Sequence, residues 1–153
     1  MIYSGNCLSV ATLDQASDIA ELVFDAPGSV NKFDRQTVEE LDAATQALKA
    51  ADGIKAVIVR SAKSTFIVGA DITEFGKPPE DPWLPQVVDA IEACAKPVVA
   101  ALHGTALGGG FEAALSNNVL IAEESARFGF PEITFGMFPG MGAISLLSRK
   151  ITP

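Results

Sequence analysis

The chain has 153 residues, a net charge of −8, 48% apolar residues and 20% charged residues. This length fits one domain, and the apolar content is close to that of globular proteins and far from that of disordered chains. Because the eleven lysines and arginines are scattered singly, the basic stripe of a nucleic-acid-binding surface is missing. The composition therefore predicts a single domain, residues 1–153, and excludes nucleic acid as a partner.

Several classes of segment and site are also excluded. No uncharged stretch reaches the roughly 18–20 apolar residues of a membrane helix, so no membrane partner is expected. The first ten residues lack a basic region followed by an apolar block, which predicts a cytoplasmic chain. Cys7 and Cys94 lie far apart and His103 is the only histidine, so we expect free thiols, no disulfide framework and no metal site. Carboxylates and backbone groups must then carry any reaction.

The apolar pattern predicts alternating strands and helices, which is the α/β class. Strands are expected at residues 19–24, 56–59, 66–68, 98–102, 119–122 and 127–130. Helices are expected at residues 35–51 after an Asp34 cap, at 87–94 and at 139–150, with a short helix from Ile72 and a helix start at 111–115. Glycine and proline predict loops at residues 25–31, 76–85 and 104–110.

A run of three glycines, Gly108 to Gly110, separates a predicted strand from a predicted helix. The free N–H groups at such a helix start can stabilise an anion. A phosphate-binding P-loop needs lysine at position 110, and the glycine spacing does not fit a dinucleotide fingerprint either. From glycine content alone, a tight turn without any ligand is an equally good interpretation.

Two glutamates can act as base and acid. Glu112 lies in the first turn of the predicted helix, where the helix dipole favours the ionised form. Glu132 follows Phe128-Gly129-Phe130-Pro131, an apolar frame that would raise its pKa if it were buried. Carboxylates in such different environments suit a general base, Glu112, and a general acid, Glu132. The alternative is that both are solvated turn residues, as most glutamates are.

A second backbone donor is expected after the predicted strand at residues 66–68. The Gly69-Ala70 turn can expose the N–H of Ala70. Together with the N–H of Gly109, this donor would complete an oxyanion hole.

Three segments together resemble the crotonase family, which contains enoyl-CoA hydratases and isomerases: FIVGADITEF at residues 66–75, ALGGGFE at 106–112 and FGFPEITFGMFPGMG at 128–142. Residues 1–76 resemble the hydratase domain of the fatty-acid oxidation complex α subunit, and residues 97–153 resemble synthases of diffusible fatty-acid signals. The resemblance implies an α/β, crotonase-like ββα spiral fold that lacks the family's carboxy-terminal helical region. It also implies a trimer-based homo-oligomer or a part of a larger polypeptide.

The same resemblance implies a site and a reaction. The N–H groups of Ala70 and Gly109 would hold a thioester oxygen, while Glu112 and Glu132 share the attacking water. Further residues implied to bind substrate are Gly69, Asp71, Ile72, Gly108 and Gly140. The implied reaction is hydration of 2-enoyl-CoA, with no cofactor besides the coenzyme A of the substrate. Two alternatives stay open: dehydration and hydrolysis of 3-hydroxyacyl carrier protein thioesters, and a non-catalytic acyl-CoA-binding or assembly fragment.

Overall fold

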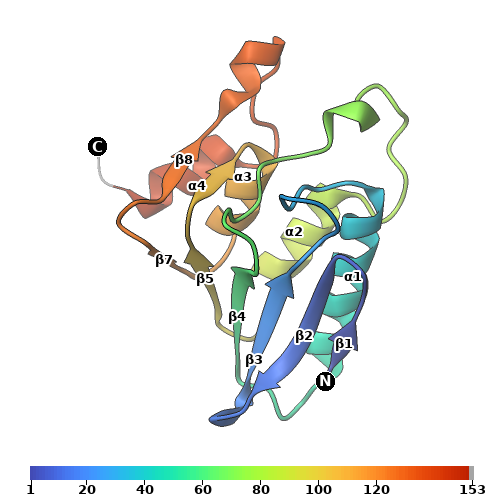
Figure 1. Cartoon of the computed structure of the whole chain (residues 1–153), viewed down its shortest axis with the longest axis vertical. Coiled ribbons are helices and arrows are strands. Elements are labelled where there is room, and N and C mark those ends of the chain that lie inside the picture. Colours follow the sequence, from blue (N-terminus) through green and yellow to red (C-terminus); the bar gives the residue numbers. More distant parts are fainter. Residues whose placement is uncertain (152–153) are drawn as a thin grey trace.

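The computed structural model describes residues 1–151, which form a mixed α/β structure (Figure 1). The strands are β1 (Tyr3–Ser4), β2 (Leu8–Leu13), β3 (Ala16–Phe24), β4 (Ala56–Ser61), β5 (Val98–Leu102), β6 (Thr105–Leu107), β7 (Val119–Ala122) and β8 (Arg127–Gly129). The helices are α1 (Arg35–Ala50), α2 (Leu84–Glu92), α3 (Gly109–Leu115) and α4 (Ala143–Lys150), with short 3₁₀ helices η1 (Ile72–Glu74) and η2 (Pro131–Phe135). The predicted α/β class is confirmed.

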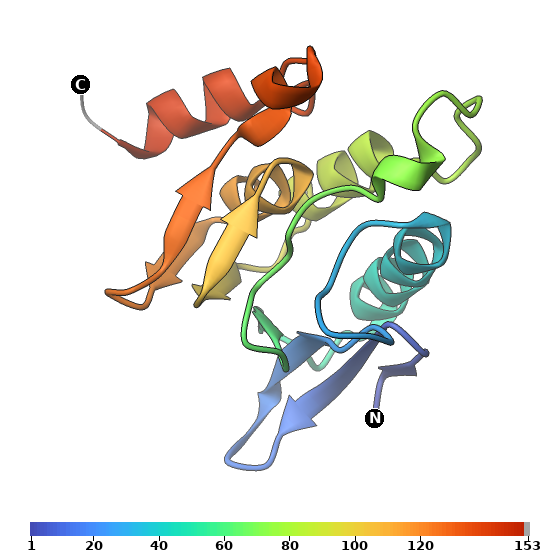
Figure 2. The ribbon, with the colours of Figure 1, turned by 45° about the horizontal axis from the view of Figure 1, so that its top comes forward.

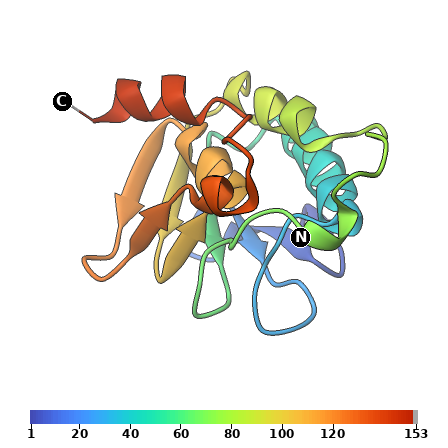
Figure 3. The same ribbon diagram turned by 90° about the horizontal axis from the view of Figure 1, so that it is seen from above.

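The main sheet has the strand order β1-β2-β3-β4-β5-β7, and β6 and β8 form a separate pair. β1, β2 and β3 pair antiparallel, whereas β3, β4, β5 and β7 run parallel. Parallel neighbours need long crossover connections, and these contain α1, α2 and α3 in turn. Figure 2 shows α1 and α2 side by side, and Figure 3 shows α4 beyond α3, on the side away from α1.

Helix α1 follows its sequence signals closely. The side chain of Asp34 accepts a hydrogen bond from the N–H of Thr37 at 2.8 Å, so the predicted cap is confirmed. The apolar residues that recur at helical spacing are all buried, namely Val38, Leu41, Ala44 and Leu48. They pack with alternating residues of β3, β4 and β5 in one continuous core. A local amphipathic pattern was therefore enough to place this helix.

Several predicted boundaries are wrong. Residues 66–68 form no strand. Their N–H and C=O groups bond instead to Thr105 and Leu107 on one side and to the backbone and side chain of Asn31 on the other. The predicted loop 104–110 contains β6, and α3 begins at Gly109. α4 begins only at Ala143, because Gly142 has a φ of +97° and adopts a left-handed conformation.

The proline-rich segment and the amino terminus hold further differences. α2 begins inside the predicted loop 76–85, with Pro85 in its first turn, where proline is tolerated. β1 and β2 were not predicted.

None of the helices in residues 1–151 is long and apolar enough to cross a membrane.

Candidate active site

Two parallel strands bring the predicted glutamates together. β6 pairs with β8, with Leu107 opposite Gly129, and the N–H of Gly108 donates to the carbonyl of Gly129 at 2.9 Å. Because the carboxyl ends of parallel strands meet at one edge, α3 and η2 begin beside each other. These two elements carry Glu112 and Glu132.

Gly108 contacts Glu132 at this edge. Its φ is +51°, and a Cβ built on it would lie 2.9 Å from Oε1 of Glu132. A side chain at position 108 would therefore strain the backbone and displace the carboxylate. This close approach explains why glycine occupies position 108, and the role of Gly108 in substrate binding stays a prediction.

Three stacked aromatic rings join α3 to the segment that leads into η2. Phe111 stacks on Phe128 with a centroid distance of 5.0 Å and on Phe130 with a centroid distance of 5.1 Å. Phe111 is buried in this arrangement. Each such pair stabilises by about 0.5–1.5 kcal/mol beyond the burial of its area, so the stack holds Glu132 close to α3.

Glu112 is a buried carboxylate that is only 2% exposed. Its Oε1 accepts hydrogen bonds from the N–H groups of Met141 at 2.8 Å and Ala143 at 3.1 Å. Burial raises the pKa of Glu112, these hydrogen bonds lower it, and the charge of Glu132 raises it, with a net upward shift. The sequence argument from the helix start left out this burial, which acts in the opposite direction and disfavours the ionised form. A raised pKa moves the carboxylate toward the range in which a general base is most effective.

Glu132 is half-buried, and one of its carboxylate oxygens has no partner. Among the residues that the structure describes, nothing donates to the enclosed Oε2. A buried polar atom left unpaired costs about 1–3 kcal/mol, so a hydrogen-bond partner supplied by a ligand or a water would be favoured there. The assignment of Glu132 as general acid stays a prediction.

The two backbone N–H groups that were predicted as oxyanion donors are free of protein acceptors among the described residues. In residues 1–151, neither the N–H of Ala70 nor that of Gly109 donates to a protein acceptor. Gly109 is the first residue of α3, where an N–H has no intrahelical acceptor. α3 runs very close to the segment before Ala70: a Cβ at Gly110 would overlap the carbonyl group of Ile67. The predicted oxyanion donors therefore lie on neighbouring segments.

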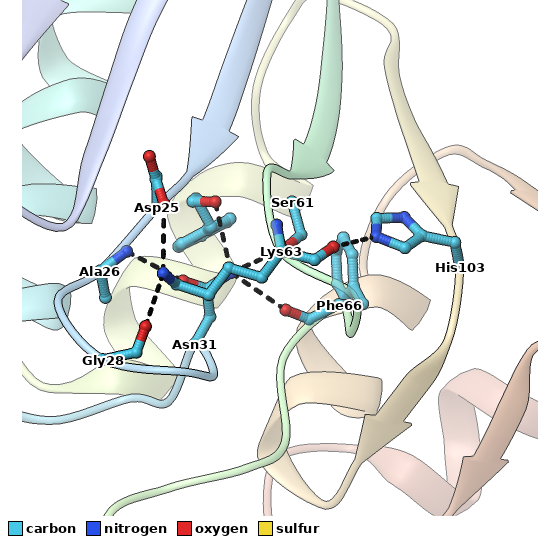
Figure 4. A network of polar contacts seen from close by, with 9 residues as sticks. Asp25, Ala26, Gly28, Asn31, Ser61, Lys63, Phe66 and His103 are labelled. Atoms are coloured by element: carbon cyan, nitrogen blue, oxygen red, sulfur yellow. Dashed lines mark hydrogen bonds and ion pairs between the residues drawn. The ribbon is translucent and has the colours of Figure 1, made fainter.

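A polar network holds the segment that leads to Ala70 (Figure 4). The buried side chain of Asn31 accepts a hydrogen bond from the N–H of Ala26 and donates to the Oγ of Ser61 and to the carbonyls of Phe24 and Phe66. Sequence reasoning missed Asn31, because a lone asparagine at the end of a predicted loop carries no local signal. Its role follows only from the chain segments that meet around it.

The other predicted site residues lie in two places. Gly69, Asp71 and Ile72 adjoin Ala70, with Ile72 exposed. Gly140 is exposed and precedes α4, and it is the next residue, Met141, that donates to Glu112. A Cβ on Gly109 would lie 2.9 Å from the Cε of Met141, so this loop meets both α3 and its glutamate.

Asp71 provides a pH-dependent test of how the segment after Ala70 is held. Lys32 lies 2.5 Å from its Oδ2, and this contact, together with hydrogen bonds from Thr73, holds the pKa of Asp71 at about 2, below its model-peptide value of 3.8. The stabilisation by the ionised form is thus complete above pH 3.8 and is lost as the pH falls toward 2. We expect Asp71→Asn to lower the urea midpoint at neutral pH, and about half of that difference to be gone by pH 3. A difference that stays constant from pH 7 to pH 3 would contradict this assignment.

Comparisons with known proteins identify the family of this chain. The enoyl-CoA hydratase/isomerase family model matches residues 14–153. A fatty acid oxidation complex subunit alpha of Acinetobacter baumannii (strain AYE) is 47% identical over 99% of this chain, which spans only 22% of that protein.

Two solved structures share the fold. An enoyl-CoA hydratase subunit I from Geobacillus kaustophilus HTA426 has a TM-score of 0.82 and 32% identity, over 96% of this chain and 58% of that one. DspI from Pseudomonas aeruginosa has a TM-score of 0.82 and 26% identity, over 94% of this chain and 60% of that one. The predicted crotonase-like fold is confirmed, and the chain belongs to the enoyl-CoA hydratase/isomerase family.

Proposed function

We propose that this chain adds water to the double bond of 2-enoyl-CoA thioesters. The observation that carries the proposal is the unpartnered Oε2 of Glu132, enclosed near the buried Glu112. The free N–H groups of Ala70 and Gly109 suit the carbonyl oxygen of a thioester, on which negative charge grows as the conjugated double bond is attacked. Each such donor can contribute about 3–4 kcal/mol.

The two glutamates then divide the proton transfers. The carboxylate of Glu112 removes a proton from water as the water oxygen bonds to C3 of the substrate. The electron pair of the double bond moves onto the thioester, and C2 takes a proton from Oε2 of Glu132. Return of a proton from Glu112 to Glu132 resets the pair. Acid and base catalysis of this kind contributes about 10²–10⁴-fold in rate.

The relatives favour coenzyme A as the carrier of the acyl group. The matched proteins named fatty acid oxidation complex subunit alpha support a substrate drawn from fatty-acid breakdown. Because the chain spans 22% of such a protein, the proposal concerns the hydration step alone.

Crotonyl-CoA tests the proposal directly. We expect the chain to remove the absorbance of the conjugated thioester and to form a product heavier by one water, seen by mass spectrometry, without release of a free thiol. Release of thiol would favour the dehydratase and thioesterase alternative. Binding measured by calorimetry without any product would favour a non-catalytic acyl-CoA-binding fragment.

A further inference from the structure

Arg35, in the first turn of α1, is bonded to a proline-rich segment far away in the sequence. Its guanidinium donates to three successive carbonyl oxygens, those of Glu80 at 2.7 Å, Asp81 at 2.5 Å and Pro82 at 2.8 Å. Its Nε donates to Glu39 at 2.7 Å. Only the planar, five-donor fork of arginine can make all these contacts at once. Arg35 therefore clamps residues 80–82 to the start of α1.

The clamped segment forms part of the wall of a cavity of about 420 Å³. Small-molecule sites typically have volumes of about 300–1,000 Å³. Ala70 lines this cavity, so it adjoins one of the two proposed oxyanion donors. Large apolar side chains from several elements also line it, namely Phe33, Val38, Phe75, Trp83 and Leu84.

The charges of the cavity fit an acyl chain better than the phosphates of coenzyme A. Its charged lining consists of four carboxylates and two cations: Asp34, Asp71, Glu74, Glu80, Arg35 and Lys77. This excess of negative charge repels phosphate groups. The aromatic rings can instead bury methylene groups, each of which adds roughly fourfold to affinity. The cavity thus suits the part of a fatty acyl group beyond the reacting carbons.

We propose that Arg35 is a positioning residue that fixes the outer wall of an acyl-chain cavity through the carbonyls of residues 80–82. The inference rests on the proposed function, which places the thioester carbonyl at Ala70. A four-carbon substrate is too short to need this wall, whereas a ten-carbon chain packs against it. Arg35 therefore controls affinity for long chains and leaves the chemistry at the double bond unchanged.

Arg35→Gln tests the clamp with two substrates. With 2-decenoyl-CoA we expect KM to rise about tenfold, as for the loss of one or two hydrogen bonds, with kcat unchanged. With crotonyl-CoA both constants should stay within twofold. Glu39→Gln is the matched control, because it removes the ion pair of the same guanidinium and keeps the three carbonyl contacts. Arg35→Lys keeps the charge and reaches fewer carbonyls, so its decenoyl-CoA KM should be intermediate.

The single tryptophan of the chain gives a readout that does not depend on turnover. Trp83 lines the cavity, so its fluorescence should report binding of decanoyl-CoA, a saturated thioester that cannot be hydrated. We expect Arg35→Gln to weaken this binding about tenfold. If that difference appears while wild type turns over no enoyl-CoA, the hydratase proposal is wrong and the clamp stands. If variant and wild type bind decanoyl-CoA within twofold of each other, the clamp is wrong. Should Arg35→Gln unfold, Arg35→Lys decides between these outcomes.

Discussion

Glu112→Gln should lower crotonyl-CoA turnover by about 10²–10⁴-fold while leaving the fold at least as stable at neutral pH. The glutamine oxygen can still accept the hydrogen bonds from Met141 and Ala143, so the packing of this buried position is kept. The amide cannot take a proton from water, so the base is lost. A structural role for Glu112 predicts the opposite pattern, with turnover kept and stability reduced.

The pKa of Glu112 determines how the stability difference depends on pH. Burial raises this pKa in the folded state above its model-peptide value of 4.5, so Glu112 supports folding fully below pH 4.5 and less as the pH rises through the folded value. Glutamine does not titrate. The melting temperature of Glu112→Gln relative to wild type should therefore increase from acid to neutral pH.

Thermal unfolding over a pH series, with turnover measured on the same preparations, checks both expectations. Glu124→Gln is the matched control, because Glu124 is exposed and should change neither quantity. Full turnover by Glu112→Gln would rule out its role as base. A relative melting temperature that falls toward neutral pH would rule out the burial effect.

Local sequence patterns predicted the parts of the fold that depend on local chemistry. The Asp34 cap and the buried face of α1 follow from residues three or four apart. β5 and β7 were placed with their observed bounds, because each is a short continuous apolar run. Burial was predicted correctly only for β5, since most of β7 is exposed. These features need no knowledge of distant segments.

The features that build the site depend on contacts between distant residues. β6 is only three residues long and lies in a stretch that the sequence predicts as a loop. It is a strand because it pairs with β8, which follows about twenty residues later. The pKa of Glu112 depends on burial beneath a loop about thirty residues later in the chain. The helix-dipole argument considered only the helix itself and therefore left out this burial. Asn31 and Arg35 were missed for the same reason, since their partners lie far along the chain.

The three adjacent glycines show how the structure separates interpretations that composition left equal. Gly108 has a positive φ and lies against Glu132, while Gly110 lies against the backbone of Ile67. Both positions therefore exclude a side chain for steric reasons. A Cβ on Gly109 would meet only the ends of two flexible side chains, Met141 and Leu84. Packing requires glycine least at position 109, which leaves its free N–H as the feature to test.

Gly109→Pro removes that N–H at a position where a helix tolerates proline. Proline is common at the first residue of a helix, because the N–H there has no intrahelical acceptor. We expect the variant to stay folded by circular dichroism and to lose about 10²–10³-fold in crotonyl-CoA turnover, the effect of losing one oxyanion donor. Gly109→Ala keeps the N–H and displaces only the Met141 methyl group, so it should lose far less. A folded proline variant with full turnover would exclude the N–H of Gly109 from the oxyanion hole. An alanine variant as inactive as the proline variant would assign the effect to bulk at this position.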